Sequence, residues 1–210
     1  PTEDHLNSAR KLWSFSGELR FVRKVENWIY ALPENKFYLR LTNTSHRNEQ
    51  QLNAELDWMW HLQKQGINFA HPILSNNGMF VESITIGDET IYASAFHGAK
   101  SFPLKEPGDL TKARMENLGE IIGQLHAATK SYKPSSNIIP RHQWNEERAY
   151  KIIQRIRNKS EGAIYDRFEE LNTWLCSLPK TSDEYGLIHA DLHHGNFFVD
   201  ENDRITIYDF

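Results

Sequence analysis

The carboxyl-terminal part of the chain carries three side chains whose types and spacing could do chemistry. Asp191 precedes Asn196 by five residues, and Asp209 follows Asn196 by thirteen. Amide and carboxylate oxygens are ligands of the kind that bind Mg²⁺, and a further carboxylate can accept or orient the proton of a hydroxyl group. This combination is what phosphoryl transfer requires.

The segment between Asn196 and Asp209 is predicted to form a β-hairpin. Two apolar, β-prone runs flank a polar stretch, and these runs are 197–199 and 205–208. The dipeptide Asn202-Asp203 suits the positive φ angles of a two-residue turn. A turn centred there places Asn196 directly opposite Asp209 at the open end of the hairpin. Two oxygen ligands that are distant in sequence thereby become neighbours, with Asp191 just upstream.

The composition indicates a soluble globular protein. The 210 residues can form one large domain or two small ones with a hydrophobic core. A formal net charge of −4 gives no support for nucleic-acid binding, which usually requires a basic face. No apolar stretch reaches membrane-spanning length, and the single cysteine, Cys176, excludes an internal disulfide. We therefore expect a cytoplasmic protein that binds neither nucleic acid nor membrane.

The first part of the chain is predicted to form an antiparallel sheet that carries one helix. Three β-prone runs are joined by short polar turns, at 18–24, 27–32 and 36–42. The apolar residues of 47–65 recur at helical spacing, and Gly66 suits the end of that helix. A further hairpin is predicted over 79–86 and 90–96.

The second part of the chain is predicted to be helical up to the final hairpin. The apolar periodicity indicates helices over 109–129, 146–157 and 164–178. Residues 96–100 suit a short linker between the two parts. We expect an α+β, bilobal architecture with a sheet lobe at 1–96, a mainly helical lobe at 97–210, and a ligand site in the cleft between them.

The polar run at the carboxyl end resembles the signature of a known family. His189-Ala190-Asp191-Leu192-His193-His194-Gly195-Asn196, followed by Ile207-Tyr208-Asp209-Phe210, resembles the motif of the aminoglycoside phosphotransferase and choline kinase-like family. Looser matches extend the resemblance over nearly the whole chain. They are the turn at Glu26-Asn27, the strand Phe37–Leu41, the helix start at Ala54–Trp58, and Leu118-Gly119 with Leu125-His126 in a later helix. The resemblance implies a bilobal fold like that of protein kinases.

The resemblance also implies an activity and a set of site residues. The protein would be an ATP-dependent kinase that moves the γ-phosphoryl group of MgATP to a hydroxyl group of a small molecule, such as an aminosugar, an amino alcohol or a hydroxy amino acid. Asp191 would be the catalytic carboxylate, and Asn196 and Asp209 would hold Mg²⁺. The implied nucleotide-binding residues are Arg40, Glu55, Glu26 and Asn27, with Glu55 holding Arg40 beside the phosphates.

The chain departs from the family pattern at three points. Arg40 stands where the family often has lysine, and a guanidinium can still bind phosphate and pair with Glu55. The turn at 24–27 has no glycine, so the backbone is a poorer phosphate cradle. Family members also continue past the Asp-Phe pair with helices that shape the acceptor pocket. We therefore expect the natural protein to continue beyond Phe210, and the sequence does not choose among acceptors.

Two alternatives remain open from the sequence. The first is a nucleotide-binding pseudokinase or interaction module. The second is a metal-dependent hydrolase, because His189, His193 and His194 surround Asp191 at spacings that zinc sites also use. A zinc site leaves Asn196 and the hairpin unexplained, and His189 is expected to brace the loop by hydrogen bonding. The oligomeric state is left open.

Overall fold

The computed structural model describes residues 1–32, 36–99, 102–103, 107–146, 151, 153 and 162–210. The chain forms two compact units, one of Pro1–Ile139 with Leu187–Phe210 and the other of Pro140–Gly186. The first unit contains every residue of the predicted site. It combines an antiparallel sheet with helices, so the predicted α+β class is confirmed. The boundary between a sheet lobe and a helical lobe at residues 96 and 97 stays a prediction.

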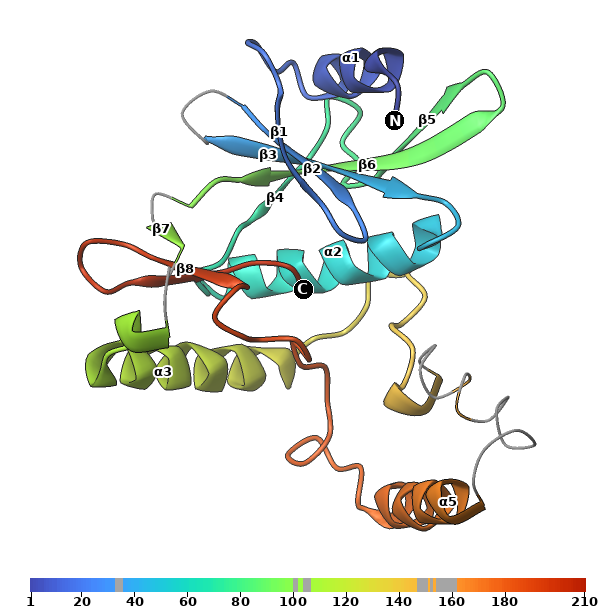
Figure 1. The fold of residues 1–210 in the computed structure, drawn as a ribbon, viewed down its shortest axis with the longest axis vertical. Helices are drawn as coiled ribbons and strands as arrows, with labels where there is room; N and C mark the ends of the chain where they lie inside the picture. The colour runs from blue at the N-terminus through green and yellow to red at the C-terminus, as the bar shows by residue number, and fades with distance from the viewer. Residues whose placement is uncertain (33–35, 100–101, 104–106, 147–150, 152, 154–161) are drawn as a thin grey trace. The chain divides into compact units, whose positions relative to one another are not determined.

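An antiparallel sheet forms the amino-terminal part of the first unit (Figure 1). Its strands in the described part of the chain are β1 (Arg20–Lys24), β2 (Trp28–Ala31), β3 (Phe37–Asn43), β4 (Pro72–Ile73), β5 (Glu82–Ile86) and β6 (Glu89–His97). They lie in the order β1-β2-β3-β6-β4, and β5 also pairs with β6. The strands and the hairpin that the sequence predicts here are confirmed.

The alternation of side chains along β3 gives the sheet two different faces. Leu39 and Leu41 are fully buried in an apolar cluster, whereas Arg40 between them points to the opposite face. The helix α1 (Glu3–Leu12) covers the apolar face (Figure 1). No helix is predicted at 3–12 from the sequence, because this ten-residue segment is mostly polar. Arg40 and Thr42 of β3 therefore face away from α1.

The helix α2 (Glu49–Lys64) lies against the other side of the sheet (Figure 1) and confirms the helix predicted over 47–65. Asn48 begins it with a capping box. The Asn48 side chain accepts a hydrogen bond from the backbone N–H of Gln51 (2.9 Å), and the Gln51 side chain accepts one from the backbone N–H of Asn48 (3.0 Å). Gly66 follows the helix with a φ of 78°, which only glycine adopts without strain.

The core of the first unit lies between α2, the helix α3 (Lys112–Thr129) and the final hairpin. Leu56, Leu125 and Ile207 are almost fully buried in this cluster. Thr111 begins α3 by accepting a hydrogen bond from a backbone N–H of its first turn. The helix predicted over 109–129 is thus confirmed, and a 3₁₀ turn, η2 (Pro107–Asp109), precedes it.

The final hairpin is present, but its predicted register is wrong. A small sheet in the order β7-β8-β9 is formed by β7 (Phe102–Pro103), β8 (Phe197–Val199) and β9 (Ile205–Ile207). Phe197 pairs with Ile207, and the backbone N–H of Tyr208 donates to the backbone oxygen of Asn196 (3.0 Å). Tyr208, rather than Asp209, is therefore the residue opposite Asn196.

The turn chemistry explains the difference in register. The backbone N–H of Asp200 donates to the oxygen of Arg204 (3.0 Å), so the loop between them has three residues instead of two. The Asp200 carboxylate accepts hydrogen bonds from the N–H groups of Asn202 and Arg204, both at 2.9 Å. Asp203 takes the left-handed position with a φ of 59°. The two hydrogen bonds that the Asp200 side chain accepts from backbone N–H groups thus stabilise the three-residue loop over the two-residue turn.

The second unit contains a 3₁₀ turn, η3 (Trp144–Glu146), and the helix α5 (Gly162–Ser177). The helix predicted over 164–178 is confirmed. Most of the helix predicted over 146–157 lies outside the described residues. None of the helices described here combines the length and the apolar character needed to cross a lipid bilayer.

Candidate active site

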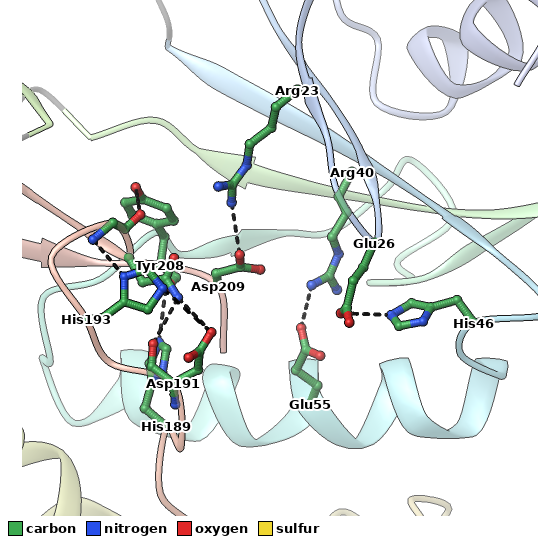
Figure 2. Close-up of polar contacts among 12 residues, drawn as sticks. Arg23, Glu26, Arg40, His46, Glu55, His189, Asp191, His193, Tyr208 and Asp209 are labelled. Atoms are coloured by element: carbon green, nitrogen blue, oxygen red, sulfur yellow. Dashed lines mark hydrogen bonds and ion pairs between the residues drawn. The ribbon is translucent and has the colours of Figure 1, made fainter. Parts of the chain in front are cut away.

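His189 fixes the loop that precedes β8 to the end of β9 (Figure 2). Its Nε2 lies 3.0 Å from the backbone oxygen of Tyr208. A carbonyl oxygen can only accept, so this nitrogen donates and carries the proton. Nδ1 is then the acceptor for the backbone N–H of Asp191 (3.4 Å). The buried imidazole holds both neighbours by hydrogen bonds, which confirms the bracing role expected for His189.

Asn196 joins the predicted catalytic carboxylate to the predicted metal site. Its side chain is buried, and Nδ2 donates to the backbone oxygen (2.9 Å) and the carboxylate Oδ2 (3.1 Å) of Asp191. The amide nitrogen is engaged in this way, so the amide oxygen is the atom that can bind a cation. The Asp191 side chain is 76 % exposed, which leaves it accessible to a substrate. Ala190 before it has a φ of 67°, a strained conformation of the kind found at functional sites.

Asp209 reaches the site by a different route from the one predicted. Strand alternation would turn it away from Asn196, because Tyr208 already occupies the opposing position. Asp209 instead has a φ of 65°, which interrupts the alternation at the end of β9. Asp191, Asn196 and Asp209 consequently line one cavity of about 340 Å³. The structure brings the three predicted side chains together, and their individual roles stay predictions.

Arg40 and Glu55 form a buried ion pair between β3 and α2 (Figure 2). Arg40 Nη1 lies 2.6 Å from Glu55 Oε1, and the two residues are only 6 % and 4 % exposed. The guanidinium also lies over the ring of Phe96, 4.9 Å from its centroid. Both members of the pair line a second cavity of about 290 Å³ whose other walls are mainly apolar. The pairing that the family resemblance implies is therefore present.

Glu26 and Asn27 form the tip of the β1–β2 hairpin and also line the 340 Å³ cavity. The Glu26 carboxylate lies 3.1 Å from Nε2 of His46, and Oδ1 of Asn27 accepts a hydrogen bond from the Thr42 hydroxyl (2.8 Å). Both side chains thus tie the turn to neighbouring segments. Any contact of this turn with phosphate would come mainly from its backbone.

Arg23 lines the candidate site, although the sequence pattern does not reveal it. It projects from β1 towards the final hairpin, and its Nη2 lies 2.9 Å from Oδ2 of Asp209 (Figure 2). It lines both cavities, together with Ile29 and Asp209. Nothing in the sequence distinguishes Arg23 from Arg20 and Lys24 of the same strand, because the direction of each side chain depends on how β1 pairs with β2.

The histidines beside Asp191 do not assemble a zinc site. His193 Nδ1 accepts a hydrogen bond from the backbone N–H of Gly195 (2.9 Å), and its Nε2 lies 3.9 Å from the Asp191 carboxylate. Among the described residues, no group of three histidine, cysteine, aspartate or glutamate side chains is arranged to hold a metal ion. The geometry therefore gives no support to the hydrolase alternative.

Comparison with protein-family models agrees with the motif and the geometry. The model of the phosphotransferase enzyme family matches residues 19–210, a span that includes every predicted site residue. The chain belongs to this family. The resemblance inferred from the two-part motif at the carboxyl end is thereby confirmed.

Named relatives within the phosphotransferase family show how far the likeness extends. Amicoumacin kinase of Bacillus subtilis (strain 168) is 33 % identical over 211 residues, which cover 99 % of this chain and 62 % of that protein. The structure of amicoumacin kinase hAmiN in complex with AMP-PNP, Ca²⁺ and Ami aligns with a TM-score of 0.86 at 28 % identity, covering 100 % of this chain and 64 % of that one.

A microcompartment-associated aminopropanol kinase aligns with a TM-score of 0.76 at 22 % identity, over 99 % of this chain and 69 % of its own. These likenesses confirm the predicted kinase-like fold. The chain spans less than two thirds of the length of both amicoumacin kinases.

The burial of His189 predicts a pH-dependent stability for this phosphotransferase-family chain. Burial lowers the pKa of His189 below its ordinary value of 6.5, although the hydrogen bond to Tyr208 opposes the shift. The unfolded chain keeps the ordinary pKa and therefore binds a proton first as the pH falls through about 6.5. The free energy of unfolding is expected to decrease in this window and to level off below the folded-state pKa.

Urea unfolding between about pH 5 and about pH 8 measures this contribution. His189→Asn removes the titrating group and is expected to flatten the dependence of the unfolding free energy on pH. His126→Asn makes the same chemical change at an exposed position of α3 and serves as the matched control for the substitution itself. An unaltered slope in His189→Asn would contradict the assignment.

Proposed function

We propose that this protein transfers the γ-phosphoryl group of MgATP to a hydroxyl group of a small molecule. The observation that carries the proposal is that the two cavities of the candidate site share lining residues. One is lined by Asp191 and Asn196, and the other by the Arg40–Glu55 pair. Asp209 lines both cavities, so a polyphosphate held beside Arg40 can extend to the predicted metal ligands.

The environment of Arg40 supports nucleotide binding. Its Nε and Nη2 have no hydrogen-bond partner among the described residues, although the residue is almost fully buried. Buried donors without acceptors are unfavourable, and phosphate oxygens match the geometry of a guanidinium fork. The apolar side chains of Ile29 and Phe96, which line the same cavity, suit the flat surface of a purine.

The predicted metal ligands suit Mg²⁺, the ion to which ATP is bound in phosphoryl transfer. The oxygens of Asn196 and Asp209 are ligands of the type that Mg²⁺ prefers, and this ion commonly takes few protein ligands besides phosphate and water. Bound there, Mg²⁺ would neutralise the charge on the transferred phosphoryl group. Asp191 would accept or orient the proton of the acceptor hydroxyl, while the amide of Asn196 holds its carboxylate in place.

The acceptor is proposed to carry an amino group near the hydroxyl, as in an aminosugar, an amino alcohol or a hydroxy amino acid. The names of the relatives support this class, since they include kinases of amicoumacin and of aminopropanol. The walls of the 340 Å³ cavity support it as well, because the carboxylates of Glu26, Asp191 and Asp209 would attract an ammonium group.

The test is an acceptor screen with ATP consumption as the readout. The protein, MgATP and a panel of aminoglycosides, amicoumacin, amino alcohols and hydroxy amino acids are combined singly, and acceptor-dependent ADP release is expected for at least one compound. The melting temperature with and without MgATP is measured in parallel. A rise in melting temperature without turnover on any acceptor would favour a nucleotide-binding module over a kinase.

Loss of one metal ligand is expected to raise the Mg²⁺ requirement. Asp209→Asn keeps the shape of the side chain but removes a charge from the predicted site, so half-maximal turnover should need at least about tenfold more Mg²⁺, because even outer-shell partners of metal ligands alter affinity by about 10- to 100-fold. Rates measured against Mg²⁺ concentration at constant ATP check this. Asp88→Asn, at an exposed position in the β5–β6 turn, is the control, and equal Mg²⁺ curves for both variants would remove Asp209 from the metal site.

A further inference from the structure

A β-bulge in β1 determines the direction of Arg23. Phe21 pairs with Tyr30, but Arg23 pairs with Ile29, so Val22 is an extra residue without an opposing partner. Directly opposed residues of an antiparallel pair share one face of the sheet. Regular pairing would place Arg23 opposite Trp28 instead. The bulge therefore moves the Arg23 side chain to the other face, which is a known use of bulges beside functional sites.

The face that receives Arg23 is the one that carries Arg40. Ile29 pairs with Arg40, and Arg40 pairs with Ser94 of β6. Arg23, Ile29, Arg40 and Ser94 thus form one cross-strand row, in which a single apolar side chain separates the two arginines. The first three members of the row line the same 290 Å³ cavity. Figure 2 shows both arginines projecting from the sheet in the same direction.

The opposite face of β1 carries a different cation. Lys24 pairs with Trp28, and its Nζ lies 4.6 Å from the centroid of the Trp28 ring. Phe21 contacts the ring of Tyr30 in an edge-on geometry on that same face. The two neighbouring cations of β1 therefore have different environments, and only Arg23 lines the cavities.

Arg23 lies where the 290 Å³ cavity beside Arg40 meets the 340 Å³ cavity that contains the predicted metal ligands. Its guanidinium lies 2.9 Å from the carboxylate of Asp209, and the side chain is 41 % exposed, so it can exchange partners at little cost. The β1–β2 turn beside it has no glycine and is a poor backbone cradle for phosphate. A polyphosphate that enters this region must approach the carboxylates of Asp191 and Asp209. These carboxylates repel the negatively charged phosphates, so a further positive charge in this region would favour binding.

We propose that Arg23 is a second phosphate-binding cation of the nucleotide site and that it contacts the terminal phosphates of ATP beside Asp209. The proposal rests on the proposed function. Arg40, held by Glu55 deeper in the cavity, would bind the phosphates nearer the nucleoside, and Arg23 would bind those nearer the metal ligands. The side chain at the end of β1 thus takes over part of the role that a glycine-rich backbone performs elsewhere.

Nucleotide binding without any acceptor tests this assignment. Arg23→Met removes the charge and keeps most of the side-chain length. It is expected to weaken ATP binding by about 10- to 100-fold, the range for a charge-assisted hydrogen bond. AMP binding should be unchanged, and ADP binding should fall less than ATP binding. Arg23→Lys is expected to recover part of the ATP affinity, since it restores charge without the guanidinium fork.

Lys24→Met is the matched control, because it removes the neighbouring cation from the opposite face, and its ATP affinity should stay within about twofold of wild type. Melting temperatures of all variants identify any that fail to fold, and Arg23→Gln replaces Arg23→Met if necessary. Equal loss of ATP and AMP affinity, or no loss of either, would overturn the role of Arg23 alone. Failure of the wild type to bind ATP would overturn the proposed function as well.

Discussion

Asp191→Asn is expected to lower kcat for acceptor phosphorylation by about 10²- to 10⁴-fold, the usual contribution of a positioned acid or base. The amide has nearly the shape of the carboxylate but cannot accept a proton in the reaction. Its oxygen can still receive the hydrogen bond that Asn196 now donates to Asp191 Oδ2 (3.1 Å). The loop and the affinity for ATP should therefore be preserved. Initial rates of ATP consumption and calorimetric titration with MgATP measure the two quantities separately.

Asp88→Asn makes the same chemical change in the exposed β5–β6 turn and should keep full activity. Three outcomes distinguish the possible roles of Asp191. Lost turnover with intact ATP binding supports the catalytic role. Full turnover in Asp191→Asn would remove it, and parallel loss of turnover, ATP binding and melting temperature would indicate that Asp191 mainly holds the loop.

The side chains that line the candidate site together could be predicted from the sequence because three of them lie in one short segment. Asp191, Asn196 and Asp209 lie within the last loop and hairpin, where local turns and two short strands fix their distances. The helix that carries Glu55 and the strand that carries Arg40 have strong periodic patterns of their own. These local preferences agree with the fold, so α2, β3 and the final hairpin could be predicted to within a few residues.

Register and strand pairing could not be predicted with the same accuracy. The sequence favours a turn at Asn202-Asp203, but the Asp200 carboxylate captures two backbone donors and lengthens the loop by one residue. The direction of the Arg23 side chain depends on a bulge at Val22, which exists only because β1 pairs with a particular register of β2. A shift by one residue reverses the face that a side chain occupies, and such shifts leave little trace in composition or periodicity.

Glu55→Leu is expected to be strongly destabilising. It leaves the Arg40 guanidinium almost fully buried without its 2.6 Å partner, and the loss of one member of a buried ion pair typically lowers the unfolding free energy by about 3–5 kcal/mol. Urea unfolding measures the change. Glu49→Leu, at an exposed position in the first turn of the same helix, is the control and should change stability by no more than about 1 kcal/mol.

The double variant Arg40→Met/Glu55→Leu separates the structural role of the pair from its role in binding. Apolar side chains of similar volume often replace a buried ion pair without loss of stability, and the adjacent Phe96 and Met59 offer apolar contacts. The double variant should therefore regain most of the stability that Glu55→Leu loses. It should not regain ATP affinity, because the unpaired Nε and Nη2 donors of Arg40 are gone. A double variant that is stable and binds ATP like the wild type would show that the pair serves only to join β3 to α2.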